Sequence, residues 1–380
     1  MSNSDKNIPI YMFDCDYSGK YHVVVSLNCG FCSRFFSFNN DEEIFEANQA
    51  FASILAQYIE DLYSRAYDKE LQTDVSQNCT SFAIDADKDS IAGEIEDLYS
   101  ILYNMPEDRD LFENSKRKAI SKFKDKYKNI NYRALCRLYE FAESGKEFSF
   151  KKFTRDIISI DAELFMLFMD LFVRPQNSIL IIAGNSSEIS PFPELNLQHR
   201  ETQAVIPLLS FKNKSEPPKK EDHETVIEDL KNNKMGCLKL NFQNTKTSVT
   251  LRYFLTELIA QILFGFYYLV SVDSLDASIV YWNRELTELK YDYINLINAE
   301  NIKVAQITLL NRMKRQIEQN PNSFFIKTGR QLLSGIGPNT FVEMLENTSE
   351  QTIKLWIKES GLFITEAQLI QKKYETAVHA

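Results

Sequence analysis

The stretch Glu46-Ala-Asn-Gln-Ala-Phe-Ala-Ser-Ile-Leu-Ala-Gln-Tyr-Ile-Glu-Asp-Leu-Tyr-Ser-Arg65 decides the fold. Apolar residues recur in it at steps of three and four, which predicts an amphipathic helix with one stripe facing a core. The stripe comprises Phe51, Ile54, Leu55, Tyr58, Ile59, Leu62 and Tyr63. On the polar face, Gln57, Glu60 and Asp61 stand at i, i+3 and i+4, a spacing at which side chains of one helix converge.

Two segments resemble the insulinase/pitrilysin family of zinc peptidases. The octet Ala56-Gln-Tyr-Ile-Glu-Asp-Leu-Tyr63 is similar to the family's Ala-His-Phe-Leu-Glu-His-Met-Leu, which contains its inverted H-x-x-E-H motif. Arg174-Pro-Gln-Asn-Ser-Ile-Leu-Ile-Ile-Ala-Gly184 is similar to the family's Arg-Pro-Glu-Asn-Met-Val-Leu-Val-Val-Val-Gly. The resemblance implies an α+β fold of two tandem homologous domains, each an antiparallel-rich sheet covered by helices on one face.

The residues that would bind zinc are replaced. Gln57 and Asp61 stand at the two histidine positions, and only Glu60, at the position of the family's general base, remains. The family's third ligand is a glutamate on a later helix, and the matching run from 112 to 123 places Ser121 and Lys122 there. Zinc sites use imidazole, thiolate or carboxylate ligands in a tetrahedral array. The resemblance therefore implies no catalytic residue, metal or cofactor in this chain. The alternative is that these degenerate positions are a solvated helix face.

Composition excludes several classes of protein. With 380 residues, 44% of them apolar, the chain can form two or three domains with sizeable cores. Residues 1–7 lack an apolar signal segment, and six cysteines without a secretory context indicate free thiols, so we expect a cytoplasmic protein. The most apolar run, 258–272, is too short for a membrane span. A net charge of −10 argues against nucleic-acid binding.

The chain is predicted to have two peptidase-like domains. Residues 191–222 combine prolines with charge and are the best candidate for a linker. They separate an N-terminal domain, 1–190, which carries the degenerate motif, from a trimmed C-terminal domain, 223–380. The two halves resemble a diverged repeat. In the first half Ser144-Gly145 is followed by a helix start near 159, and in the second half Ser334-Gly335 is followed by one near 348, so the serine-glycine pairs and the helix starts are separated by nearly the same number of residues.

Periodicity and turn residues place the elements. Strands are expected at 8–13, 21–27, 34–38, 79–84, 178–183, 236–242, 361–365 and, as a pair, within 269–282. Helices are expected at 46–65, 89–103, 111–126, 132–144, 150–158, 161–173, 248–265 and, in several pieces, from 284 to 360.

Three other motifs are weaker. Cys29-Gly-Phe-Cys32 has the spacing of a redox dithiol or half a zinc site, but nothing completes a metal site, so incidental thiols are favoured. Two short motifs of serine β-lactamases are matched, S-x-x-K by Ser149-Phe-Lys-Lys152 and K-T-G by Lys327-Thr-Gly329. The S-D-N motif of those enzymes is absent, and the K-T-G match lies in a predicted helix where the enzyme needs a strand, so a chance match is favoured. The basic run between Lys116 and Lys128 either binds an acidic partner or is a solvated face.

The resemblance implies a non-catalytic subunit of a heteromeric zinc peptidase, with zinc only in a catalytic H-x-x-E-H partner. Bacterial pairs of this kind process ribosomally made peptides, as in bacteriocin maturation, so a peptide or leader sequence is the expected substrate. The alternative is a free-standing structural or peptide-binding protein with the same fold, as with the related core subunits of respiratory complexes. An independent enzyme using Glu60 has little support, because no metal or electrophile is predicted beside it.

Overall fold

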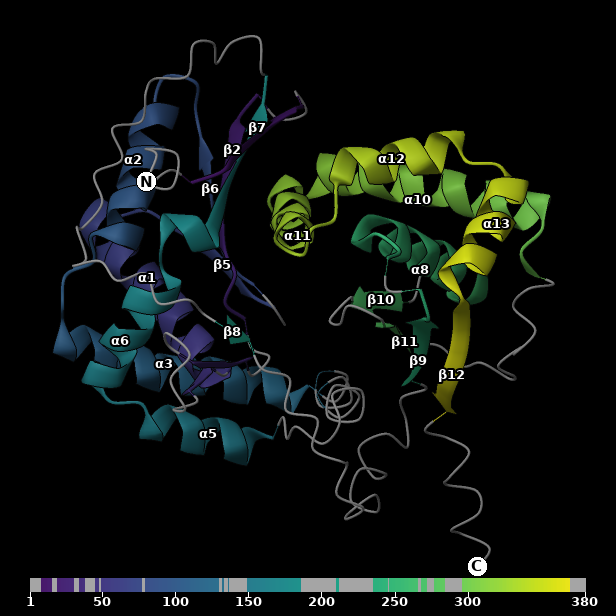
Figure 1. The fold of residues 1–380 in the computed structure, drawn as a ribbon. Helices are drawn as coiled ribbons and strands as arrows, with labels where there is room; N and C mark the ends of the chain where they lie inside the picture. Colours follow the sequence, from purple (N-terminus) through teal and green to yellow (C-terminus); the bar gives the residue numbers. More distant parts are fainter. Residues whose placement is uncertain are drawn as a thin grey trace, which may run out of the picture. The chain divides into compact units, whose positions relative to one another are not determined.

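A five-stranded sheet forms the centre of the N-terminal unit in the computed structural model (Figure 1). Its strands follow the order β1-β7-β2-β6-β5, where β1 runs parallel to β7 and the other pairs are antiparallel. The strands are β1 (Ile10–Asp14), β2 (Tyr21–Leu27), β5 (Gln72–Val75), β6 (Thr80–Ala86) and β7 (Ser178–Gly184). Every residue of β2 and β7 is buried, so both faces of the sheet are covered at its centre.

The structure describes residues 8–15, 19–30, 34–37, 45–47, 49–76, 79–129, 132, 136, 149–185, 210–211, 235–244, 246–265, 268–271, 277–283 and 296–369. It divides into two units, and each is treated by itself. Unit 1 contains Met1–Phe123, Lys151–Ser215 and Arg315–Leu333, and unit 2 contains Lys124–Phe150, Glu216–Lys314 and Ser334–Ala380.

One face of the first sheet is covered by helices that include α1 (Gln49–Tyr67), the segment with the apolar stripe (Figure 1). All seven residues of that stripe are buried, as the periodicity predicts. The ring of Phe51 packs against Phe165, Phe168 and Phe172 at centroid distances of 5.8, 4.7 and 6.1 Å. The other helices described in the first half of the sequence are α2 (Ile91–Tyr103), α3 (Arg109–Lys128), α5 (Phe150–Ser159) and α6 (Ala162–Phe172).

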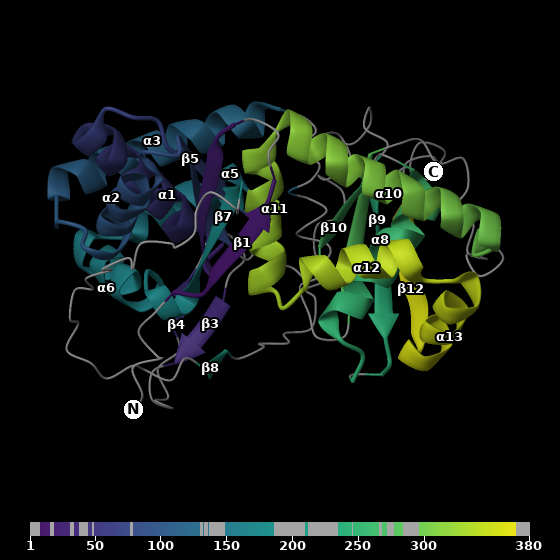
Figure 2. The same ribbon diagram turned by 90° about the horizontal axis from the view of Figure 1, so that it is seen from above.

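The opposite face is covered by α11 (Pro321–Leu333), a helix from the second half of the sequence (Figures 1 and 2). Phe325 and Ile326 of α11 form a core cluster with sheet residues such as Val24. At Gly329 the helix approaches closely, because a β-carbon there would lie 2.3 Å from Ser26 Oγ. The helical cover predicted for one face is thus present, and a helix from the predicted 223–380 domain covers the other.

Unit 2 contains a four-stranded antiparallel sheet with the order β10-β11-β9-β12. The strands are β9 (Met235–Phe242), β10 (Tyr268–Ser271), β11 (Ala277–Asn283) and β12 (Leu362–Leu369), and the helices include α8 (Val249–Phe264), α10 (Ala299–Gln319), α12 (Pro338–Asn347) and α13 (Glu350–Ser360). Side chains cap the N-termini of α6 and α13, the two helices that the predicted repeat places in corresponding positions. Asp161 accepts a bond from Leu164 N–H, and Ser349 accepts one from Thr352 N–H.

A buried polar cluster lies in the core of unit 2. The Glu257 carboxylate, 3% exposed, accepts hydrogen bonds from Tyr253 Oη at 2.5 Å, Tyr268 Oη at 2.7 Å and Arg312 Nη2 at 2.9 Å. The Arg312 guanidinium also lies over the Tyr268 ring, 5.0 Å from its centroid. Burial and the nearby carboxylate raise the pKa of Tyr268 above its usual value, so this phenol stays protonated and donates.

Several elements differ from the sequence prediction. The strands predicted at 8–13 and 21–27 are present, but β7 lies between them in the sheet. Strand β5 is an addition, as is β4 (Phe45–Ala47), which joins β3 (Arg34–Ser37) and β8 (Ser210–Phe211) in a small sheet. Strand β8 falls within the predicted linker 191–222. The rest of that linker and most of the predicted 132–144 helix lie outside the described residues. No helix in the described part of the chain has the length and apolarity to cross a membrane.

Candidate functional site

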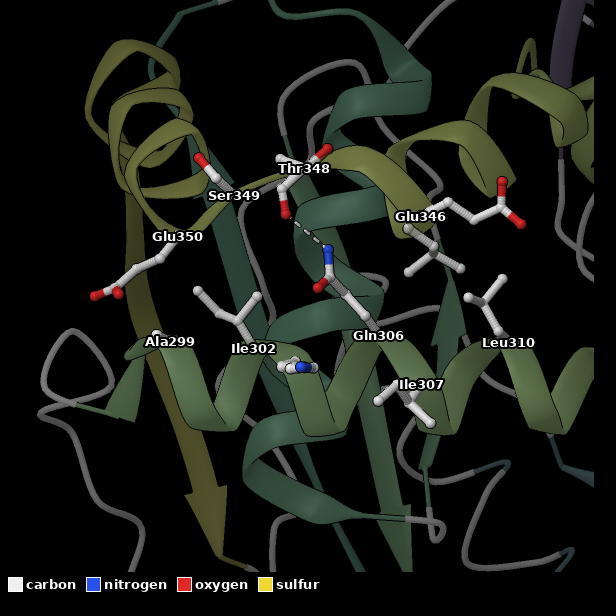
Figure 3. Close-up of a pocket in the computed structure, with 11 residues that line it drawn as sticks. Ala299, Ile302, Gln306, Ile307, Leu310, Glu346, Thr348, Ser349 and Glu350 are labelled. Carbon is white, nitrogen blue, oxygen red and sulfur yellow. Dashed lines mark hydrogen bonds between the residues drawn. The ribbon is translucent and has the colours of Figure 1, made fainter.

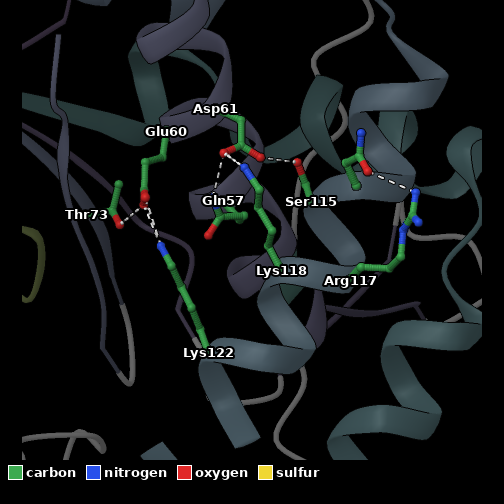
Figure 4. A network of polar contacts seen from close by, with 9 residues as sticks. Gln57, Glu60, Asp61, Thr73, Ser115, Arg117, Lys118 and Lys122 are labelled. Atoms are coloured by element: carbon green, nitrogen blue, oxygen red, sulfur yellow. Dashed lines mark hydrogen bonds and ion pairs between the residues drawn. The ribbon is translucent and has the colours of Figure 1, made fainter. Parts of the chain in front are cut away.

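The polar residues of α1 form a network with α3 and β5 (Figure 4). Gln57, only 3% exposed, donates from Nε2 to Asp61 Oδ1 at 2.8 Å, so the structure brings together the two residues that the resemblance aligns with the family's histidines. Glu60 lies one residue before Asp61 and accepts from Thr73 Oγ1 of β5 at 3.0 Å. The helix and the edge strand are therefore joined at this point.

Two lysines of α3 supply the positive charge of the network. Lys118 Nζ lies 2.6 Å from Asp61 Oδ1, and Lys122 Nζ lies 2.9 Å from both carboxylate oxygens of Glu60. Ser115 Oγ donates to Asp61 Oδ2 at 3.3 Å. Because these α3 residues stand at i, i+3 and i+7, they share one face of their helix. Two carboxylates are thus balanced by two ammonium groups.

This set of side chains does not fit zinc. A peptidase zinc site combines imidazole and carboxylate ligands around an open position, whereas Gln57 offers a neutral amide and α3 offers a hydroxyl and ammonium groups. The ammonium groups contact the carboxylates that would otherwise attract a cation. Among the described residues, no group of three or more His, Cys, Asp or Glu side chains is placed to hold a metal ion.

The predicted degenerate positions are only partly gathered here. Lys122 lies in the network, while Ser121 is exposed on α3 outside the set of residues that contact Glu60 and Asp61. Sequence reasoning missed Ser115, Lys118 and Thr73. The spacing of Ser115, Lys118 and Lys122 at i, i+3 and i+7 could have indicated a shared helix face. The comparison of this helix with the family's third-ligand segment directed attention to Ser121 and Lys122 instead.

The basic run of α3 is largely paired within the chain. Besides Lys118 and Lys122, Lys116 Nζ donates to the Ile160 carbonyl at 2.7 Å, and Lys128 Nζ lies 2.6 Å from Asp125 Oδ1. Lys124 and Lys126 are exposed on the same helix, so the run remains a solvated face that is partly neutralised by acidic residues of the chain.

The remaining motifs form no site within the described residues. Cys29 is buried, and Cys32 lies outside those residues. Lys152 pairs with Asp156 on its own helix at 2.5 Å. Residues 327–329 lie in helix α11, whereas the K-T-G motif of a β-lactamase lies on a strand.

A groove of about 440 Å³ lies in unit 2 between α10 and the connection from α12 to α13 (Figure 3). Its walls are mainly apolar, with Ile302 and Leu310 on α10, and Gln306 Nε2 donates across it to the Thr348 carbonyl at 2.9 Å.

No protein-family model matches the sequence, and no curated protein does, but solved structures share the fold. An M16-like peptidase from Alicyclobacillus acidocaldarius has 12% identity and a TM-score of 0.64, with 95% of each chain covered. A Helicobacter pylori protease has 11% identity and a TM-score of 0.59, covering 92% of this chain and 93% of that one. An inactive M16 peptidase domain from Pseudomonas fluorescens has 9% identity and a TM-score of 0.54, with 96% of each covered. The predicted peptidase-like α+β fold is confirmed.

We expect the purified protein to carry much less than one zinc per chain, because the network offers no imidazole and its carboxylates are already paired. Elemental analysis after dialysis measures this. The variant Gln57→His with Asp61→His should show no peptidase activity with added zinc, because it still lacks the third ligand and its supporting contacts. About one zinc per wild-type chain, lost in Gln57→Ala, would contradict the prediction.

Proposed function

We propose that this chain is the non-catalytic subunit of a heteromeric zinc peptidase. A second chain with an intact H-x-x-E-H motif would carry the zinc and cleave, while this chain closes the chamber and holds the substrate. The observation that carries the proposal is the network of Glu60 with Lys122 and Asp61 with Lys118, which lies where the sequence resemblance predicts the H-x-x-E-H motif. The peptidase fold is kept while the residues that would bind the metal are tied to one another.

Strand β5 is the proposed site for the peptide. Among the strands the structure describes, β5 is an edge of its sheet, and it contacts the network through Thr73. Ser76 N–H donates to the Cys79 carbonyl at 2.8 Å, so the antiparallel alternation points the backbone groups of Thr73 and Val75 away from β6. An extended peptide can add there as a further strand.

The proposed substrate is a peptide or leader sequence, and maturation of a ribosomally made peptide in the cytoplasm is the setting we favour. Recognition through backbone hydrogen bonds suits a leader that is extended before cleavage, because affinity then depends little on individual side chains. The net charge of −10 supports a preference for basic peptides.

The second candidate function is a free-standing peptide-binding protein. The observation that favours it is that the β5 edge is formed entirely by this chain's own sheet, so peptide binding does not by itself require a peptidase partner.

The deciding experiment mixes this chain with an H-x-x-E-H protein encoded in the same genome. We expect no cleavage of a quenched leader peptide by this chain alone, weak cleavage by the H-x-x-E-H protein alone, and at least a tenfold increase when both are present. The increase should be abolished by a chelator. Association should survive Gln57→Ala and Glu60→Ala, since these side chains are engaged within unit 1.

A matched pair of variants tests the β5 edge. Val75→Pro removes an outward N–H group without breaking a bond to β6, so it should abolish the increase, whereas Val75→Ala keeps that group and should retain it. If this chain binds the peptide but forms no complex with the H-x-x-E-H protein and does not change that protein's turnover, the free-standing function is favoured instead.

A further inference from the structure

Strand β1, at the other edge of the first sheet, exposes three consecutive apolar side chains. Ile10, Tyr11 and Met12 are 44%, 38% and 46% exposed. Within the described strands, β1 has β7 on one side and no strand on the other. Proteins usually protect such an edge with lysine, proline or a bulge, and the sequence Ile-Tyr-Met-Phe-Asp contains neither residue.

The hydrogen bonds to β7 show which backbone groups face outward. Leu180 N–H donates to the Pro9 carbonyl at 2.9 Å, and Cys15 N–H donates to the Gly184 carbonyl at 3.0 Å. Since backbone direction alternates along a strand, the odd-numbered residues bond β7, and the N–H and C=O groups of Ile10 and Met12 point away from it.

We propose that this edge pairs with the same edge of a second copy of the chain, through an antiparallel two-fold contact centred on Tyr11. In this register Ile10 faces Met12 of the second copy, so the outward backbone groups of both strands meet. The two Tyr11 side chains face each other as an aromatic cross-strand pair. From Ile10 to Met12, apolar side chains then lie opposite apolar side chains.

Charge selects this arrangement over a parallel one. Asp14 is the only charged residue of β1. In the antiparallel register the two Asp14 residues are separated by about six residue steps, roughly 20 Å, which exceeds the screening length of about 8 Å at physiological salt. A parallel pairing would place the carboxylates on adjacent strands, roughly 5 Å apart, where they repel.

The contact is expected to be weak. Two five-residue strands bury much less than the roughly 1,200 Å² of a stable interface, so the dissociation constant should exceed about 1 μM. This surface is on the opposite edge from β5, and the pairing is independent of the peptidase partner proposed above.

Sedimentation velocity of the full chain from about 1 to about 500 μM tests the proposal. The mass should rise from 44.1 kDa toward twice that value for the wild type. Met12→Pro removes the outward N–H but no bond to β7, so it should stay monomeric, while Met12→Leu should still dimerise. Hydrogen exchange provides a second measurement, because the Met12 amide should become protected only at high wild-type concentration, whether or not Met12→Pro folds. A monomer throughout, a dimer that survives in folded Met12→Pro, or a Met12 amide whose exchange is independent of concentration would overturn the proposal.

Discussion

Replacing Arg312 with methionine is expected to lower the free energy of unfolding of unit 2 by about 3–5 kcal/mol. The substitution removes the Arg312 guanidinium from the buried Glu257 carboxylate, while the hydroxyls of Tyr253 and Tyr268 still donate to it. A buried charge that loses its counter-charge still carries the free-energy cost of its desolvation. Removing one partner therefore destabilises the protein by more than the intact pair contributes to its stability. Both tryptophans, Trp282 and Trp356, lie in unit 2, so their fluorescence in urea reports this transition.

The matched control is Lys314→Met, an exposed lysine of unit 2 two residues further along α10, which should change the unfolding free energy by less than about 0.5 kcal/mol. The double variant Arg312→Met with Glu257→Leu removes both charges and should recover most of the loss. Equal effects of the Arg312 and Lys314 substitutions would show that the buried pair does not stabilise unit 2.

Replacing Gly329 with alanine should destabilise unit 1 by about 1–3 kcal/mol, although alanine favours a helix over glycine by roughly 1 kcal/mol. The new methyl group would lie 2.3 Å from Ser26 Oγ, a fully buried hydroxyl that bonds Ser81 Oγ at 2.8 Å. The helix must therefore move off the sheet or break that hydrogen bond. Thermal unfolding followed by near-ultraviolet circular dichroism measures the loss.

Gly93 in α2 is the matched control, because a β-carbon there meets no atom within 4 Å. Gly93→Ala should stabilise the protein by about 0.5–1 kcal/mol through helix propensity. Ser26→Gly should partly rescue Gly329→Ala by making room for the methyl group. If Gly329→Ala and Gly93→Ala shift stability in the same direction, the close approach of α11 is not a constraint.

The sequence predicts those elements in which apolar residues recur with the period of a helix or a strand. Helix α1 could be located because its seven apolar residues recur at helical spacing and all of them are buried. Strand β5 was missed, because Gln72-Thr-Asp-Val75 has no apolar alternation and is held by its pairing with β6.

The candidate site was harder to predict, because it depends on contacts between distant segments. Lys118 and Lys122 are two of many lysines in α3, and only the docking of α3 against α1 selects them as partners of Asp61 and Glu60. Likewise, the helix at 321–333 was expected from its composition, but no local pattern indicates that it packs on a sheet formed some 150 residues earlier in the chain.

That last feature has a consequence for synthesis on the ribosome. When β7 is complete at Gly184, one apolar face of the first sheet lacks the cover of α11 until that helix ends at Leu333. At about 5–20 residues per second, the intervening roughly 150 residues take about 8–30 s to translate. During this interval Val24, Ala83 and Ile181 lack the helix that buries them. The nascent chain should therefore be a chaperone client, and a fragment ending in the 191–222 segment should aggregate.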